Sequence, residues 1–217
     1  MSNAEKLTTL LARFESARRT FLAQINPLSQ EQFDFKPASD AWSIGEVAHH
    51  IALTEQTFQG TLKELFEKGA QSGGATRNLG IHELPMGPSI IPQSILQGIL
   101  QFPGVRVPLS LGASIVPGFI QSFILANPIL KIRTAPELQP DAGLPRQKLL
   151  ASLQRLRAAT LALVEPLRDK DLSRYRWHHP LLGARDVYST LEMLADHDQR
   201  HSIQVERIKR ARAFPSV

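Results

Sequence analysis

Residues 184–212 read ARDVYSTLEMLADHDQRHSIQVERIKRAR. The apolar residues of this stretch recur at intervals of three and four, which is the spacing of one face of an α-helix. They are Val187, Leu191, Leu194, Ala195, Ile203 and Ile208. The spacing predicts a long amphipathic helix that turns this face toward a hydrophobic core, so we expect the chain to fold around helices.

Three other stretches carry the same spacing and predict helices at about 4–25, 43–68 and 144–167. Ser43 stands at the start of the second helix with Glu46 three residues later, as in a capping box. The expected core face of the first helix consists of Leu7, Leu10, Leu11, Phe14, Ala17, Phe21 and Ile25.

No stretch alternates between apolar and polar residues as a strand would, and residues 169–183 are expected to form a loop. The predicted fold class is all-α: a four-helix bundle with a long crossover between its second and third helices. A chain of 217 residues is expected to form one domain over 1–217.

The segment from about 70 to 140 interrupts this helical pattern. It holds nine of the fifteen prolines, and no residue from Val107 to Leu130 is charged. A transmembrane helix needs about 20 apolar residues, but Pro108 and Pro117 break this stretch. We therefore expect an apolar, proline-rich insertion of short helices that covers one end of the bundle or forms a dimer face, with membrane contact a weaker alternative.

Composition excludes several classes of site. The chain has no cysteine, so disulfides, thiolate metal ligands and a cysteine nucleophile are excluded. The formal net charge is +5, but basic residues such as Arg18 and Arg19 are interleaved with acids and are expected on solvated helix faces rather than in a nucleic-acid patch. The N-terminus carries no apolar signal region, which favours a cytoplasmic location.

A histidine pair within residues 184–212 points to a metal ion. His197 and His201 are four residues apart, so on a helix they share one face and their imidazoles can converge on one ion. Zinc sites of the H-E-x-x-H type use this spacing, but here the general-base glutamate is missing, and that mechanism does not transfer. From the pair alone, a histidine pair without a metal is an equally good interpretation.

A third histidine favours the metal. His50, in the second predicted helix, shares a face with Val47 and Phe58 and is expected to point inward, while His49 points about 100° away. Three imidazoles with coordination positions left open are typical of a catalytic rather than a structural site.

Three further residues are candidates around this site. Glu55 is a candidate general base or partner of a ligand, although a solvated surface acid is the favoured interpretation. Asp198 could orient a ligand histidine or pair with a neighbouring cation. Arg200 could hold an anionic substrate, although an exposed or structural role is favoured.

Four short motifs follow one another along the chain. They are Trp42-Ser43 with a histidine eight positions after the tryptophan, Thr134-Ala135-Pro136-Glu137-Leu138, His179-Pro180-Leu181-Leu182-Gly183, and the His197-x-x-x-His201 pair followed by Gln204. In this order they resemble the DinB-like superfamily, over most of the chain except the centre of segment 70–133.

The resemblance implies a four-helix bundle with a long crossover and one metal held by three histidines, which here correspond to His50, His197 and His201. Zinc and nickel are the usual metals. Members are described as metal-dependent hydrolases or as transferases that act with low-molecular-weight thiols, and many dimerise. The family name comes from induction by DNA damage and implies no DNA binding.

Two functions from different classes follow. The first is a metal-dependent enzyme, a hydrolase or thiol S-transferase acting on a small molecule. The alternative is a non-catalytic binding or interaction protein that uses the apolar insertion to meet a partner, a lipid surface or a second copy. Open coordination positions favour the enzyme, whereas the uncharged stretch favours the binding protein.

Overall fold

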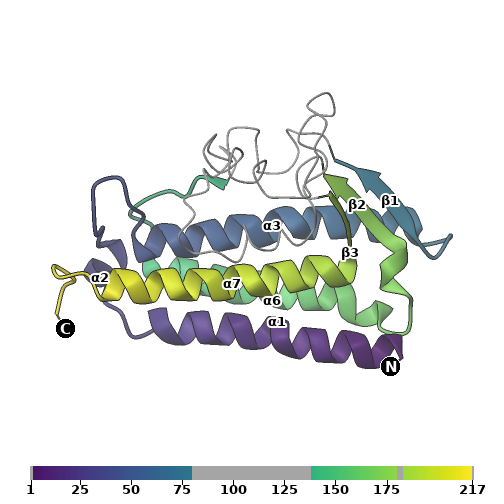
Figure 1. The fold of residues 1–217 in the computed structure, drawn as a ribbon, viewed down its shortest axis with the longest axis horizontal. Coiled ribbons are helices and arrows are strands. Elements are labelled where there is room, and N and C mark those ends of the chain that lie inside the picture. The colour runs from purple at the N-terminus through teal and green to yellow at the C-terminus, as the bar shows by residue number, and fades with distance from the viewer. Residues whose placement is uncertain (1, 80–137, 180–182, 217) are drawn as a thin grey trace, which may run out of the picture.

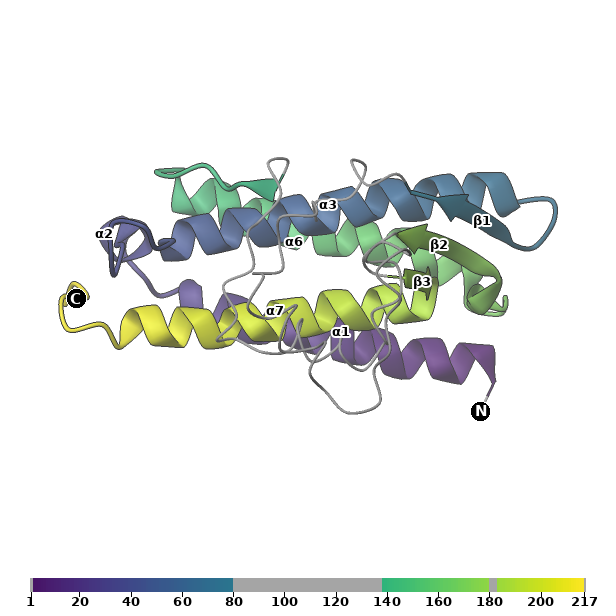
Figure 2. The same cartoon turned by 45° about the horizontal axis from the view of Figure 1, so that its top comes forward.

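The computed structural model describes residues 2–79, 138–179 and 183–216. Four long helices lie alongside one another (Figure 1). They are α1 (Asn3–Ile25), α3 (Ile44–Gly69), α6 (Arg146–Val164) and α7 (Val187–Lys209). The described structure is mostly helical, consistent with the predicted all-α class, and each of these four helices lies where its apolar spacing predicts it. Figures 1 and 2 show that α1 and α7 run in one direction and that α3 and α6 run in the other.

The helix starts follow from local sequence. Ser43 Oγ accepts a hydrogen bond from the backbone N–H of Glu46 at 3.1 Å, and Glu46 Oε2 accepts one from the N–H of Ser43 at 2.8 Å, which is the predicted capping box. Ser2 and Asp186 begin α1 and α7 in the same way. These caps satisfy backbone donors that have no partner within the helix.

Three short helices and a small sheet complete the described structure. The helices are α2 (Gln30–Asp34) and the 3-10 turns η2 (Glu165–Leu167) and η3 (Leu172–Arg174). The strands are β1 (Ala75–Asn78), β2 (Tyr175–His179) and β3 (Gly183–Asp186), with β1 parallel to β2 and β2 antiparallel to β3.

The sequence did not predict this sheet, and the loop expected at 169–183 is wrong over β2. Strands of four and five residues are too short to show alternation, and β1 pairs with a strand about a hundred residues later. Trp177 and Tyr175 anchor β2: both rings are fully buried, and Trp177 Nε1 donates to Thr190 Oγ1 at 2.8 Å.

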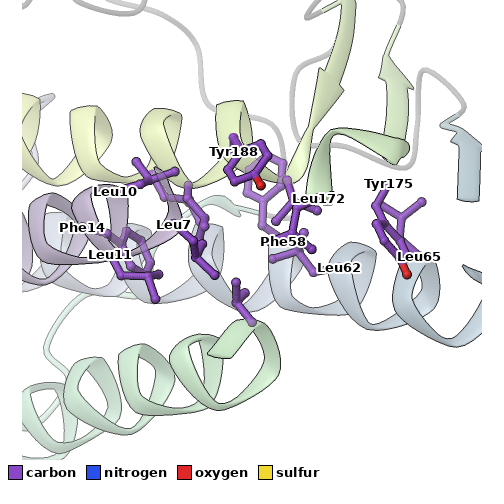
Figure 3. Close-up of a cluster of buried hydrophobic side chains, with 14 of the residues drawn as sticks. Leu7, Leu10, Leu11, Phe14, Phe58, Leu62, Leu65, Leu172, Tyr175 and Tyr188 are labelled. Carbon is purple, nitrogen blue, oxygen red and sulfur yellow. The ribbon is translucent and has the colours of Figure 1, made fainter. Parts of the chain in front are cut away.

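The buried apolar side chains form two separate clusters. The first joins the N-terminal half of α1, the C-terminal half of α3 and the start of α7 (Figure 3); its members include Leu7, Phe14, Phe58, Leu62, Trp177 and Leu191. The second lies at the opposite ends of these helices and includes Phe21, Ile25, Val47, Ile51, Leu153 and Val205. The core is therefore divided along the helix axes.

One residue of the core face predicted for α7 is wrong. Ile203 is 43% exposed. At about 100° per residue it lies nearly opposite the buried stripe of α7, which polar residues such as Asp198 and Ser202 continue toward Val205. Apolar type alone misplaced Ile203, because the inward positions of these turns carry polar side chains.

The predicted insertion lies largely outside the described residues, and so does the stretch 107–130. Within residues 2–79, 138–179 and 183–216, no helix has both the length and the apolar character needed to cross a membrane.

Candidate metal centre

The structure brings the three predicted histidines together. His50 comes from α3, and His197 and His201 come from α7, so two helices far apart in sequence supply the site. His197 Nε2 lies 3.1 Å from His50 Nε2 and 3.1 Å from His201 Nε2. One ligand atom of each ring lies within 4.8 Å of the others, so the cluster is able to hold a metal ion.

The hydrogen bonds at Nδ1 of His50 and His201 fix which ring nitrogen of each histidine carries the proton. His50 Nδ1 lies 3.1 Å from the backbone oxygen of Leu138, and His201 Nδ1 lies 2.8 Å from Gln204 Oε1. A carbonyl oxygen only accepts, so in both histidines Nδ1 carries the proton and donates it. In a neutral imidazole this leaves a lone pair on Nε2, directed at the third histidine.

The Nε2 atoms of His50 and His201 each carry a lone pair, so among the three Nε2 atoms there are at least two lone pairs and at most one proton. His197 Nε2 can donate one proton at most, yet it faces two acceptor nitrogens. A cation bound at the usual 2.0–2.1 Å in a tetrahedral shell separates its nitrogen ligands by about 3.3 Å, close to the observed spacing. The donor set and its tautomers fit a divalent metal better than a hydrogen-bonded histidine cluster.

Burial keeps these imidazoles neutral. It lowers the pKa of His50 to about 4, against a partial opposing effect of the Leu138 carbonyl. Burial, followed by the neighbouring His50, lowers the pKa of His201 to about 3. Burial also lowers the pKa of His197 well below its ordinary value. Near neutral pH all three are in the form that binds metals.

Arg200 and Trp42 lie beside the cluster. Arg200 is half-buried, and its positive charge is among the causes that lower the pKa of each of the three histidines. The Trp42 ring is centred 5.0 Å from the His50 ring. His49 lies outside the cluster, as predicted, and its Nδ1 accepts from the backbone N–H of Asp141 at 2.9 Å.

The expectation that Glu55 is a solvated acid is wrong. Its side chain is 1% exposed and accepts hydrogen bonds from Arg18 Nη2 at 2.7 Å, Arg157 Nε at 3.1 Å and Thr160 Oγ1 at 2.7 Å. Burial alone would raise the pKa of Glu55, but the charges of Arg18 and Arg157 outweigh it and lower the pKa. A carboxylate held in this way is a poor proton acceptor, which argues against a general base.

Arg18 was also expected in solvent and is 3% exposed. It stands four residues after Phe14 and three before Phe21, in the middle of the buried stripe of α1. Asp198 takes the second of its two predicted roles and pairs with cations, accepting from Arg18 Nε and from Arg157 Nη2, each at 2.9 Å. Arg157 was not predicted from the sequence. It stands four residues after Leu153 on α6, and this spacing places it on the same buried face.

The model of the DinB superfamily matches residues 13–205. No match was found among curated proteins or among solved structures.

Proposed function

Because the chain belongs to the DinB superfamily, we propose that it is an enzyme that holds one divalent cation through His50, His197 and His201. The cation is zinc or nickel, both of which imidazole nitrogens bind well. The observation that carries the proposal is the pair of Nδ1 hydrogen bonds, to Leu138 O and Gln204 Oε1, which direct two lone pairs at one point. Such outer partners are typical of histidines that bind metals.

Three protein ligands leave coordination positions open for a substrate. A divalent cation bound there supplies Lewis acidity, which lowers the pKa of a thiol or a water molecule in contact with it. The chain contributes the rest: His50 and His201 are held in one orientation by Leu138 and Gln204, and Arg200 brings a positive charge near the site.

Of the two family activities, we favour transfer to or from a low-molecular-weight thiol over hydrolysis. Hydrolysis usually needs a general base to take a proton from water. Among the described residues, the buried carboxylates within five positions of a ligand are Glu46, Glu55 and Asp198. Lys36 pairs with Glu46, and arginines pair with the other two. Asp196, next to His197, is exposed and pairs with Arg13. A thiol ionises more readily than water, so its sulfur can attack an electrophile while its proton passes to solvent.

The proposal includes the finer fold. We assign the four long helices to a DinB-like bundle with a long crossover between α3 and α6, and we expect a homodimer in the cytoplasm. The alternative role, an interaction protein, rests on residues 107–130, and these lie outside the described part of the chain.

A thiol screen tests the activity. Protein loaded with zinc or with nickel is incubated with low-molecular-weight thiols and an electrophile, and S-conjugates are detected by mass spectrometry. The control is the triple variant His50→Ala, His197→Ala, His201→Ala, loaded in the same way. We expect metal-dependent conjugates from the wild type alone; equal yields from both proteins contradict the proposal.

A further inference from the structure

A layer of buried charge separates the two apolar clusters. Each long helix contributes one residue to it: Arg18 from α1, Glu55 from α3, Arg157 from α6 and Asp198 from α7. All four are at most 5% exposed. On every helix this residue falls where membership changes from one cluster to the other, for example between Phe14 and Phe21 on α1. We call these four residues the charged layer.

The charged layer is a closed ring of ion pairs. Arg18 bridges the two acids, reaching Glu55 Oε2 at 2.7 Å and Asp198 Oδ2 at 2.9 Å. Arg157 bridges the same two acids, reaching Glu55 Oε1 at 3.1 Å and Asp198 Oδ2 at 2.9 Å. Two positive and two negative charges balance within the ring. Each acid pairs with both arginines, so α3 and α7 are linked through α1 and again through α6.

Bonds outside the ring fix its members further. Arg18 Nη1 donates to the backbone oxygen of Leu153 on α6 at 2.8 Å. Arg157 donates to the backbone oxygen of Phe14 on α1, and its guanidinium lies over the Phe14 ring. Each arginine thus also donates a hydrogen bond to the backbone of another helix. These bonds fix the position of α1 and α6 along their axes as well as their rotation.

Stability alone does not account for this ring. Taking four charges out of water is expensive, and well-packed apolar residues of similar volume are often as stabilising as buried ion pairs or more so. Buried ionic groups can instead specify one arrangement of helices, as a single polar residue does in the core of a coiled coil. The charged layer lies between two apolar clusters that could otherwise slide or rotate against each other.

The charged layer is directly continuous with the metal ligands. Asp198 is the residue after His197 and stands three before His201, and Glu55 stands five after His50. Turning a helix by about 10° moves a side-chain atom about 6 Å from its axis by about 1 Å. Productive metal sites require ligands placed within about 0.5 Å. Fixing Asp198 and Glu55 therefore fixes the imidazoles to the accuracy that a metal needs.

We propose that the charged layer holds α3 and α7 in the rotation and register at which the three histidines converge, so that its four members are positioning residues for the metal centre. This inference rests on the proposed function, because it assumes that the histidines bind a metal. It assigns the layer a role in metal affinity that is separate from its contribution to stability.

The test replaces the whole layer by apolar residues: Arg18→Met, Glu55→Leu, Arg157→Met and Asp198→Leu together. The matched control is Leu65→Ala, which opens a cavity in the first cluster (Figure 3) and lies fifteen residues along α3 from His50. Thermal melting is measured without metal, and Co²⁺ affinity is measured from the visible spectrum and by zinc competition at a temperature where all proteins are folded.

We expect the quadruple variant to melt at or above the wild-type temperature and to bind Co²⁺ about 10- to 100-fold more weakly, the loss usual when the outer support of a metal site is removed. Leu65→Ala is expected to melt lower and to bind with wild-type affinity. A folded quadruple variant with wild-type affinity and spectrum overturns the inference.

If the quadruple variant does not fold, Glu55→Gln replaces it, and its affinity is compared with that of Leu65→Ala. Weaker binding by Glu55→Gln alone supports positioning, and equal binding by the two overturns it. A wild type that binds no Co²⁺ contradicts the metal centre itself and removes the basis of the inference, so the two failures are distinguishable.

Discussion

Glu55→Leu tests the buried role of this carboxylate. The side chain is 1% exposed and pairs with Arg18 and Arg157. Removing it leaves two buried guanidinium groups with one acid, Asp198, between them. Breaking a buried pair by removing one partner costs about 3–5 kcal/mol of unfolding free energy. In a chain of this size, that lowers the melting temperature by about 6–20 °C.

Comparison with the quadruple apolar variant distinguishes a coupled ring from four independent contributions to stability. If the four positions acted independently at this cost, together they would remove about 12–20 kcal/mol, which equals or exceeds the whole stability of a typical domain. We expect instead that the quadruple variant is about as stable as the wild type, because it leaves no charge of the layer without its partner. The four substitutions should therefore be strongly non-additive.

Urea unfolding followed by circular dichroism, with metal chelated, measures both variants. Glu15→Ala is the control: Glu15 lies on α1 with a 42% exposed side chain and a weak pair with Arg19 at 3.7 Å, so less than about 1 kcal/mol should be lost. If Glu55→Leu loses no more than Glu15→Ala, the reasoning about the buried ring is refuted. That result would restore Glu55 as an accessible acid near the site.

Three further predictions follow. In the metal-free protein burial lowers the pKa of His50 to about 4, below its ordinary value near 6.5. The unfolded state therefore binds the proton first, and the free energy of unfolding should fall as pH falls from about 6.5 toward 4. In urea unfolding His50→Leu should lose less stability than the wild type over this range, and equal losses contradict the prediction. Gln204→Leu removes the acceptor for His201 Nδ1 and should weaken Co²⁺ binding about 10- to 100-fold with little change in melting temperature, whereas wild-type affinity would show that this contact is dispensable. Ile203→Ala should change the free energy of unfolding by less than about 0.5 kcal/mol because this side chain is exposed. Val205→Ala should cost about 2 kcal/mol in the same assay because Val205 is buried. The reverse order would mean that the buried face of α7 is assigned wrongly.

The four long helices could be predicted because each repeats its apolar spacing over about five turns or more. The capping box at Ser43 marked the start of α3 to within a residue. The strands could not be predicted, because four or five residues show no period and because β1 finds its partner about a hundred residues later. Such pairing is a tertiary effect that local sequence does not contain.

The three histidines could be predicted to converge because helix spacing placed each on an inward face. Arg18 and Glu55 were misplaced for the opposite reason: charged residues were assigned to solvent by type, although Arg18 lies between Phe14 and Phe21 on the buried stripe. A charge on an inward face is meaningful only with its partners, and those come from three other helices. Position on the helix was the better guide than residue type.

The metal content of the protein tests the central claim most directly. Protein produced without a histidine tag is analysed for zinc, nickel and other transition metals, alongside His50→Ala and its neighbour control His49→Ala, both checked for folding. We predict about one metal ion per chain in the wild type and in His49→Ala, and almost none in His50→Ala. A His50→Ala protein that retains the full metal content would contradict the three-histidine centre.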